Sequence, residues 1–295
     1  MPKIPYHYYL ILAMLLWGGG WSALKVITQN QPMEVIVFWR FFIMSLSFLP
    51  ILYFIKQPIK LGKSSLKFIL GSSVLNIGFM VSSYYGVKYG LAGSAGVIIT
   101  TLSPVMTFLL VALVFQKRLR NIQYFGLFIG VIGGGVMLEL HHIEKFVEGA
   151  NLFFLLCALL WAGVTMLSQY SQVHIHPVHY SFFISLVATI ATFFYGMQSN
   201  LLGVFEEDAT FWFALIYLAV LGQSVATTIF YIASGKLGSE KTSSFMFLVP
   251  VFALFIAYLF LDEPLQTHIL IGGAISMAAV YFINKKERTK PPQDS

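Results

Sequence analysis

The chain has 295 residues, of which 58% are hydrophobic and only 10% are charged, and its mean hydropathy is +0.79. A soluble domain carries about a quarter charged residues, so this composition excludes a soluble globular protein and indicates a membrane protein. The net charge of +6 does not indicate nucleic-acid binding, because the basic residues are spread between apolar segments rather than gathered on one polar face. The single cysteine, Cys157, has no disulfide partner and no metal-ligand spacing.

Apolar segments of membrane-spanning length follow one another along the chain. A spanning helix needs roughly 20 mainly apolar residues. Ten segments qualify, separated by short joins rich in Pro, Gly, Asn and charge: residues 8–28, 34–55, 66–87, 91–115, 121–139, 151–171, 178–199, 211–233, 238–260 and 267–284. Residues 1–9 lead into the first segment without a small-residue cleavage pattern, so that segment is expected to be retained. The sequence therefore predicts an all-α membrane protein with ten transmembrane helices.

The second half of the chain repeats the first. Trp17 in a Leu-Leu-Trp-Gly stretch recurs as Trp161 in Leu-Leu-Trp-Ala, and residues 84–136 are echoed by residues 230–282 at a constant offset of 146. Each copy holds five spans, an odd number, so the copies cross the membrane in opposite senses. Inverted-topology repeats are typical of secondary transporters, with the substrate site between the halves. We predict a first repeat over residues 1–140, a second over 149–284 and a disordered cytoplasmic tail over 285–295.

Charged residues divide between the two sides of the predicted bundle. With the N-terminus placed inside, the inside ends and joins contain 14 of the 18 basic residues, and the outside ends and joins contain 9 of the 12 acidic ones. The basic excess is the positive-inside signal, and the acidic excess gives weaker support. This pattern predicts a multi-pass protein of the plasma membrane, the bacterial inner membrane, with both termini cytoplasmic.

Short motifs occur in a fixed order and are partly duplicated between the halves: Leu16-Trp17-Gly18 with Lys25, Arg40, Tyr84-Tyr85-Gly86-Val87-Lys88-Tyr89-Gly90, Ser103-Pro104-Val105, Leu160-Trp161, Pro250-Val251-Phe252-Ala253 and Leu261-Asp262-Glu263-Pro264-Leu265. In this order and spacing, over nearly the whole chain, the sequence resembles the drug/metabolite transporter superfamily, specifically its EamA-type ten-helix exporters. The first copy departs from the family at Gln116-Lys117-Arg118, where an acidic residue is common.

The resemblance implies a two-fold pseudosymmetric bundle that moves a small metabolite through a central cavity by alternating access, with the third and fourth helices and the eighth and ninth helices shifting as pairs. It implies no particular substrate, because members handle amino acids, sugars, phosphorylated compounds and amphiphilic drugs.

Three basic residues lie near the outer ends of predicted spans. Arg40 lies roughly 9 Å into its span at about 1.5 Å per residue. A charge at that depth either faces a cavity or a partner, or snorkels to the outer headgroups. Lys25 and Lys88 lie closer to the outer ends, where snorkelling is favoured. The functional alternative groups all three as a cationic vestibule that binds a carboxylate or phosphate of the substrate.

Aromatic and amide side chains supply further candidates for substrate binding. Trp17 and Trp161 occupy equivalent positions, away from the interfaces where tryptophan concentrates. They either pack against neighbouring helices or line the cavity with an indole donor. The third and eighth spans add four candidates, each of which can instead bridge helices through a hydrogen bond worth ~1 kcal/mol: Asn76, Tyr84, Gln223 and Tyr231.

Two prolines interrupt equivalent helices. Pro104 and Pro250 stand at the offset of 146 residues, and each removes a backbone donor from its predicted helix. The interruption produces either a static bend or a hinge. Their symmetric placement favours the hinge, although a static bend would be duplicated with the gene as well.

The sequence favours a secondary transporter that exports a small metabolite, such as an amino acid or related carboxylate-bearing compound. Translocation of an anionic lipid carrier or amphiphile is the alternative. No carboxylate or histidine falls near the middle of a span, which argues against proton coupling. The chain lacks paired aspartates or a Ser/His dyad at depth, so an enzyme is not favoured. We expect no cofactor and no metal, a small-molecule substrate and the lipid bilayer as partners, no nucleic acid, and leave a homodimer open.

Overall fold

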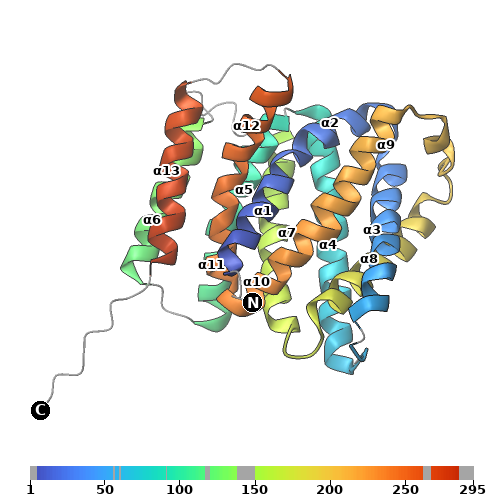
Figure 1. The fold of residues 1–295 in the computed structure, drawn as a ribbon, viewed down its shortest axis with the longest axis horizontal. Helices are drawn as coiled ribbons and strands as arrows, with labels where there is room; N and C mark the ends of the chain where they lie inside the picture. Colours follow the sequence, from blue (N-terminus) through green and yellow to red (C-terminus); the bar gives the residue numbers. More distant parts are fainter. Residues whose placement is uncertain are drawn as a thin grey trace, which may run out of the picture.

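The computed structural model describes residues 5–55, 57–59, 61–90, 92–116, 120–137, 150–261 and 267–285. The regular elements in these residues are all helical (Figure 1): α1 (Tyr6–Gly18), α2 (Gly20–Asn30), α3 (Met33–Ile55), α4 (Lys63–Tyr89), α5 (Ala92–Phe115), α6 (Asn121–Met137), α7 (Ala150–Ser171), α8 (Pro177–Gly196), η2 (Gly203–Glu206), α9 (Ala209–Ile216), η3 (Tyr217–Thr227), α10 (Thr228–Leu237), α11 (Ser239–Ser244), η4 (Phe245–Leu248), α12 (Val249–Leu261) and α13 (Thr267–Asn284). The predicted tail lies outside the described residues, apart from Lys285.

The helices confirm the predicted all-α membrane fold with two five-helix repeats. Seven helical stretches of the described chain are long and apolar enough to cross a membrane. The first stretch joins α1 to α2, and the last joins α9, η3 and α10. Residues 121–136 and 270–284 form shorter apolar helices, and α11, η4 and α12 together cover the ninth predicted span.

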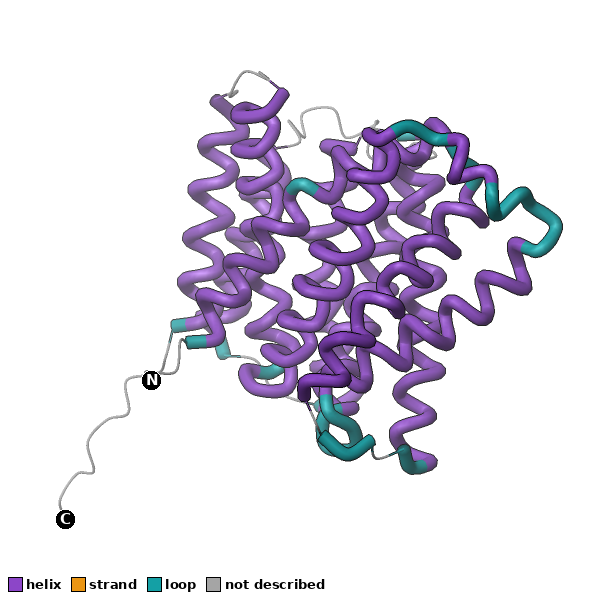
Figure 2. The backbone as a smooth tube through the Cα atoms, turned by 45° about the vertical axis from the view of Figure 1, so that its right-hand side comes forward, coloured by secondary structure: helices purple, strands orange, loops and turns teal. Residues whose placement is uncertain are grey.

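Helix packing follows a pseudo-two-fold relationship between the repeats. The corresponding helices α6 and α13 pack along each other, as do α3 and α8. Figures 1 and 2 show α6 and α13 as a pair at one side of the bundle. In the centre, α7 packs on α4 and α5, while α1 packs on η3, α10 and α12. Because α7 corresponds to α1, and α4 and α5 correspond to the later elements, the two halves make matching contacts.

Local chemistry explains where several helices begin and how they approach each other. The Asp208 carboxylate accepts a hydrogen bond from the amide of Phe211 at 2.9 Å and caps α9. Pro177 opens α8 at a position where its missing N–H is tolerated. A Cβ added to Gly133 would lie 2.6 Å from Ser276 Oγ and 2.9 Å from Gly272 O, so α6 and α13 require glycine there.

Three of the spans are interrupted where they meet the centre of the molecule. The first is broken at Gly19, and the Tyr217 hydroxyl donates to Leu16 O at 2.6 Å beside the break. The eighth runs through the π-helix η3, in which the Thr227 hydroxyl donates to Gly222 O at 3.2 Å. The ninth contains the 3₁₀ turn η4, which ends two residues before Pro250. At the first two interruptions, a side-chain hydroxyl therefore binds a backbone carbonyl, Leu16 O or Gly222 O.

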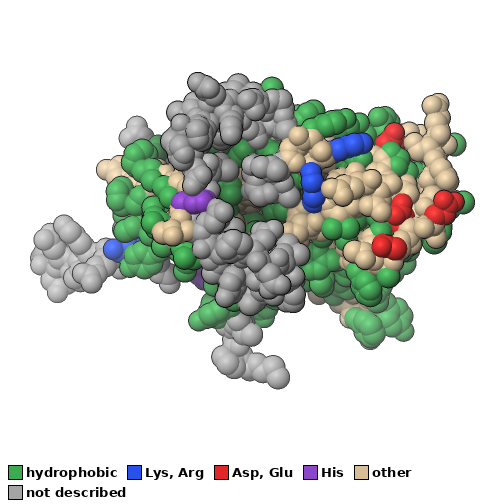
Figure 3. All heavy atoms as spheres, turned by 90° about the horizontal axis from the view of Figure 1, so that it is seen from above, with side chains coloured by type: hydrophobic (Ala, Val, Ile, Leu, Met, Phe, Trp, Pro, Cys, Tyr) green, Lys and Arg blue, Asp and Glu red, His purple; other side chains and the backbone are tan. Residues whose placement is uncertain are grey.

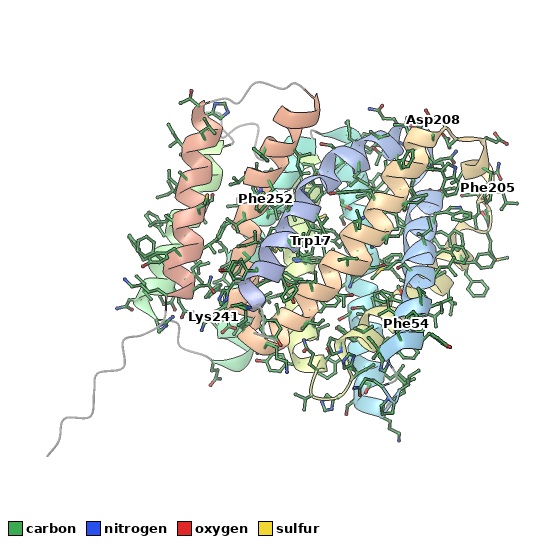
Figure 4. All side chains as sticks on the ribbon, viewed as in Figure 1. Trp17, Phe54, Phe205, Asp208, Lys241 and Phe252 are labelled. Carbon is green, nitrogen blue, oxygen red and sulfur yellow. The ribbon has the colours of Figure 1, made fainter. Side chains whose placement is uncertain are left out.

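The two ends of the bundle differ in charge. Figure 4 places Asp208 at one end and Lys241 at the other, and α1 begins and α13 ends at the Lys241 end. Seen from the Asp208 end (Figure 3), acidic side chains gather at one edge and basic side chains lie closer to the middle. The described charged residues of this end are Lys25, Glu34, Lys88, Glu206, Glu207 and Asp208.

Candidate functional site

A cavity lies between the two repeats, and Figure 4 shows Trp17 midway between the ends of the bundle. Its described wall combines apolar, aromatic and thioether side chains with a few polar groups: Leu16, Trp17, Gly20, Trp21, Leu24, Arg40, Met44, Asn76, Phe79, Met80, Ser83, Ile99, Thr100, Trp161, Leu218, Gly222, Gln223, Thr227, Met246 and Val249. An apolar cavity with a small number of placed polar groups is typical of a small-molecule binding site.

Arg40 supplies the charge of this cavity. Its side chain is only 7% exposed, so it does not snorkel to a headgroup region. The guanidinium Nε donates to Gln223 Oε1 at 3.1 Å, and Gln223 Nε2 faces the sulfur of Met80 at 3.5 Å. Among the described residues no carboxylate pairs with Arg40. A buried guanidinium with a neutral partner retains donors that suit an anionic ligand.

Four aromatic rings pack together at the central cavity, on the wall that also contains Arg40. Trp17 and Trp161 meet edge to face, with ring centroids 5.1 Å apart and planes at 86°. Phe230 packs against both tryptophans, and Phe79 packs against Trp161 at 5.0 Å. Edge-to-face contacts of this kind hold the rings in fixed orientations. Both tryptophans therefore line the cavity and also pack on each other. The two alternatives that the sequence left open, helix packing and cavity lining, thus apply together.

The π-helix η3 makes the two tryptophans unequal. The indole Nε1 of Trp17 donates to Gly222 O at 2.9 Å, whereas the indole Nε1 of Trp161 is buried without a hydrogen-bond partner in the described chain. Gly222 aligns with Asn76 at the repeat offset, and Asn76 lies within the regular helix α4. A π-helix displaces the backbone hydrogen bonds of an α-helix, so Gly222 O can accept the hydrogen bond from Trp17. Asn76, the counterpart of Gly222, lies in a regular α-helix, and its carbonyl accepts no hydrogen bond from Trp161.

The two prolines each follow a cavity residue by four positions. Thr100 precedes Pro104 and Met246 precedes Pro250, and both line the cavity. Pro104 lies within a continuous α5, while Pro250 is the second residue of α12, after η4. The carbonyl of Met246 accepts from the amide of Val249 in that turn. The surroundings of the two prolines therefore differ, and their role as hinges stays a prediction.

Lys25, Lys88 and Tyr84 lie away from the central cavity. Lys25 Nζ donates to Val87 O at 2.9 Å and to Gly90 O at 3.1 Å, so it binds the carbonyl end of α4. Lys88 donates to the hydroxyl of Tyr84 at 3.3 Å, and Tyr84 in turn donates to Gln31 O. Both lysines border a separate pocket at the Asp208 end. The structure therefore does not bring Arg40 and the two lysines together in one vestibule.

Tyr231 lies in a buried polar cluster between the cavity and the Lys241 end. Asn76, which does line the cavity, donates from Nδ2 to the Tyr231 hydroxyl at 3.3 Å. The ring of Tyr180 lies 5.6 Å from that of Tyr231, and its hydroxyl bonds to Ser72. Ser168 and Ser234 bridge α7 and α10 through their hydroxyls at 2.7 Å. This cluster closes the space between α4, α7, α8 and α10.

The model of the EamA-like transporter family matches the chain twice, over residues 4–138 and 149–285. The chain belongs to the EamA-like transporter family. The resemblance seen in the motifs is confirmed, and the protein is a multi-pass membrane transporter.

Relatives of this EamA-like transporter match it over most of their length. The uncharacterized transporter YoaV of Bacillus subtilis is 22% identical over 92% of this chain and 94% of its own. A probable amino-acid metabolite efflux pump of Escherichia coli is 25% identical over 92% of both chains. A solved structure titled only "Crystal structure of protein" superposes with a TM-score of 0.70 at 15% identity, over 95% of this chain and 97% of that one, which shows a shared fold.

Several cavity residues of this EamA-like transporter had no signal in the sequence. Met44, Met80, Gly222 and Met246 belong to no motif that distinguishes them from other residues of their spans. Of the nine predicted binding residues, the structure places five in the cavity wall: Trp17, Arg40, Asn76, Trp161 and Gln223. Their contact with a substrate stays a prediction.

Proposed function

We propose that this EamA-like transporter exports a small carboxylate-bearing metabolite through the central cavity by alternating access. The observation that carries the proposal is the burial of Arg40 in the cavity wall with the neutral Gln223 as its hydrogen-bond partner. A charge inside a span is costly, and it persists where it serves a ligand or a pathway. A carboxylate fits because the guanidinium can bind it with paired hydrogen bonds.

Contacts on both sides of the cavity support alternating access. On the Asp208 side, Lys25 ties α2 to the end of α4. On the Lys241 side, the hydrogen bond between Ser168 and Ser234 joins α7 to α10. Opening the cavity to one side requires breaking only the contacts of that side, because the two sets share no residue. Separate contacts above and below one central site are what an inverted-repeat transporter needs.

The distribution of charge and the name of one relative support the proposed direction of transport and the location of the protein. The Lys241 end carries described basic residues at the ends of α4, α6, α10, α11 and α13, so we assign it to the cytoplasm together with both termini. The Escherichia coli relative is named as a probable amino-acid metabolite efflux pump, and efflux across the bacterial inner membrane is accordingly the proposed direction. The spans offer no carboxylate near their middle for proton coupling, so the substrate's own gradient would drive the flux.

Transport by the reconstituted protein tests the proposal. Proteoliposomes are loaded in turn with a panel of radiolabelled amino acids and their N-acetyl derivatives, and efflux is measured for the unchanged protein and for Arg40→Gln. We expect efflux of at least one carboxylate, reduced at least about tenfold in Arg40→Gln. Lys63→Gln removes an exposed lysine at the start of α4 and serves as the control with unchanged flux.

Two outcomes would contradict the proposal. Arg40→Gln that folds and transports like the unchanged protein would show that the guanidinium does not bind the substrate. Efflux confined to anionic lipid carriers, with none of the small carboxylates transported, would favour the lipid alternative instead.

A further inference from the structure

The charge balance of the cavity indicates which carboxylates fit it, an inference that rests on the proposed function. Of the described residues that line the cavity, Arg40 alone carries a charge near neutral pH. The described carboxylates are Glu34, Glu206, Glu207, Asp208 and Glu240, and none of them belongs to the cavity wall. The empty cavity therefore holds one positive charge in the low-dielectric interior of the membrane protein.

The net charge of the ligand then decides how much charge stays buried. A monoanionic carboxylate neutralises Arg40 and leaves the occupied cavity with no net charge. A zwitterionic amino acid brings its own positive ammonium, so the occupied cavity keeps one unbalanced positive charge. Burying an uncompensated charge costs several kcal/mol even after relaxation. The cavity should therefore favour a monoanion over a zwitterion with the same side chain.

The neutral polar groups of the wall suit an amide better than an ammonium. The hydroxyl of Ser83 donates to Met80 O at 2.9 Å, that of Thr227 donates to Gly222 O at 3.2 Å, and that of Thr100 donates to Gly96 O. Each hydroxyl has used its only hydrogen and keeps lone pairs that can accept one. Single neutral acceptors match the one N–H of an acylated amine, but they cannot balance the full charge of an ammonium.

Apart from Asn76 and Gln223, the other described side chains of the wall are apolar or aromatic. Trp17, Trp21, Phe79 and Trp161 form its aromatic part, and the thioether sulfurs of Met44 and Met80 lie 3.9 and 3.5 Å from Gln223 Nε2. Unbranched thioether side chains adapt to ligands of different shapes. This part of the wall suits an apolar side chain or acyl group.

From these observations we propose that the cavity selects monoanionic carboxylates whose amine is absent or acylated, such as N-acyl amino acids, over free zwitterionic amino acids. The carboxylate binds Arg40, the amide N–H donates to a wall hydroxyl, and the apolar group contacts the aromatic and thioether wall.

A monoanionic substrate has a consequence for the driving force. Export of one negative charge from a cell with a negative interior is favoured by roughly 50-fold in the accumulation ratio for each 100 mV. A zwitterion gains nothing from the potential. Efflux that needs no proton coupling is therefore driven outward by the membrane potential if the substrate is a monoanion.

Matched ligands test the selection by charge. Purified protein is titrated with alanine, leucine, methionine and phenylalanine, each as the free amino acid, the N-acetyl acid and the uncharged N-acetyl amide, and the thermal unfolding temperature is followed. We expect N-acetyl acids to bind at least about tenfold more tightly than the free amino acids, and the amides not to bind.

The variant Gln223→Glu changes the charge of the cavity with almost no change of shape. Its carboxylate takes the place of the amide oxygen that accepts from Arg40 Nε, so the cavity becomes neutral before the ligand arrives. We expect the preference for N-acetyl acids over free amino acids to fall to within about threefold. Asn76→Asp is not a suitable replacement for this test because Asn76 Nδ2 donates to Ser72 O and the Tyr231 hydroxyl.

The outcomes separate the inference from the proposed function. Free amino acids that bind as tightly as their N-acetyl acids would overturn the selection by charge and leave a carboxylate transporter. A preference that persists unchanged in a folded Gln223→Glu protein would also overturn it. Failure of every carboxylate to bind would overturn the proposed function itself. In proteoliposomes, a potassium diffusion potential that leaves N-acetyl acid efflux unchanged would contradict the transport of a monoanion.

Discussion

Trp17 and Trp161 are equivalent residues whose ring centroids lie 5.1 Å apart, yet of the two indoles only that of Trp17 has a hydrogen-bond acceptor, Gly222 O. The difference arises in the opposing helix, because Gly222 lies in a π-helix and its counterpart Asn76 lies in a regular α-helix. The repeats thus share a scaffold while differing in backbone geometry at the cavity. An inverted repeat in one conformation requires such a difference, since identical halves would open to both sides equally.

The unequal hydrogen bonding of the tryptophans predicts unequal effects of substitution. Trp17→Phe removes the bond to Gly222 O and should destabilise the protein by about 1 kcal/mol. Trp161→Phe removes a buried donor without a partner, so its loss of ring area is compensated and the net change should be smaller. Thermal unfolding of both variants in one detergent, followed by circular dichroism, checks the order. Equal destabilisation would show that the hydrogen bond does not contribute.

The sequence predicted the architecture well because architecture depends on patterns that repeat. Span length, charge asymmetry and the Trp17–Trp161 and Pro104–Pro250 pairs are all readable from residue types and spacing. The contact between Arg40 and Gln223 was not readable, because it joins residues 183 positions apart in opposite repeats. The π-helix was not readable either, since residues 217–227 contain no distinctive breaker besides Gly222.

Depth along a helix also failed to indicate which basic residues share a site. Arg40, Lys25 and Lys88 all lie near the outer ends of spans in the sequence, but direction around the helix decides their surroundings. Arg40 points into the bundle, whereas Lys25 reaches the terminal carbonyls of a neighbouring helix. Helix carbonyl ends attract lysine, and this local interaction competes with any role in a shared vestibule.

The contact between α6 and α13 should be sensitive to a single methyl group. Gly133→Ala places a Cβ 2.6 Å from Ser276 Oγ and 2.9 Å from Gly272 O, and a backbone atom cannot move aside as a side chain can. We expect a destabilisation of about 1–3 kcal/mol, which exceeds the gain in helix propensity. Gly71→Ala in α4 is the matched control, because its nearest neighbour would be Leu167 Cδ1 at 3.4 Å. Equal unfolding temperatures for the two variants would contradict the tight packing.

The start of α8 should respond to pH through His176. Its Nδ1 accepts from the amide of Val178 at 3.4 Å, and burial lowers the pKa of His176 below the usual value. The unfolded chain therefore binds the proton more readily, so this stabilisation is present above about pH 6.5 and is lost as pH falls through the lowered pKa. Asparagine caps a helix without titrating, and His176→Asn should show a smaller drop in unfolding temperature between about pH 7.5 and about pH 5. An undiminished drop would assign the pH response to other groups.

The bond from Lys25 to the end of α4 should hold the Asp208 side of the cavity closed. Lys25 Nζ binds two carbonyls, Val87 O and Gly90 O, and nothing in methionine can replace those hydrogen bonds. We expect Lys25→Met to separate α2 from α4 more often and to raise the reactivity of a cysteine placed at Leu24, a cavity residue that is 3% exposed.

The measurement is simple because Cys157 is the single native cysteine and can be changed to alanine. The rate of maleimide labelling at Leu24→Cys should then increase several-fold, on the order of threefold or more if each lost hydrogen bond contributes its usual 0.5–1.5 kcal/mol. Lys63→Met removes an equal charge at the opposite end and should leave the rate unchanged. If Lys25→Met labels no faster than this control, the lysine caps α4 without controlling access to the cavity.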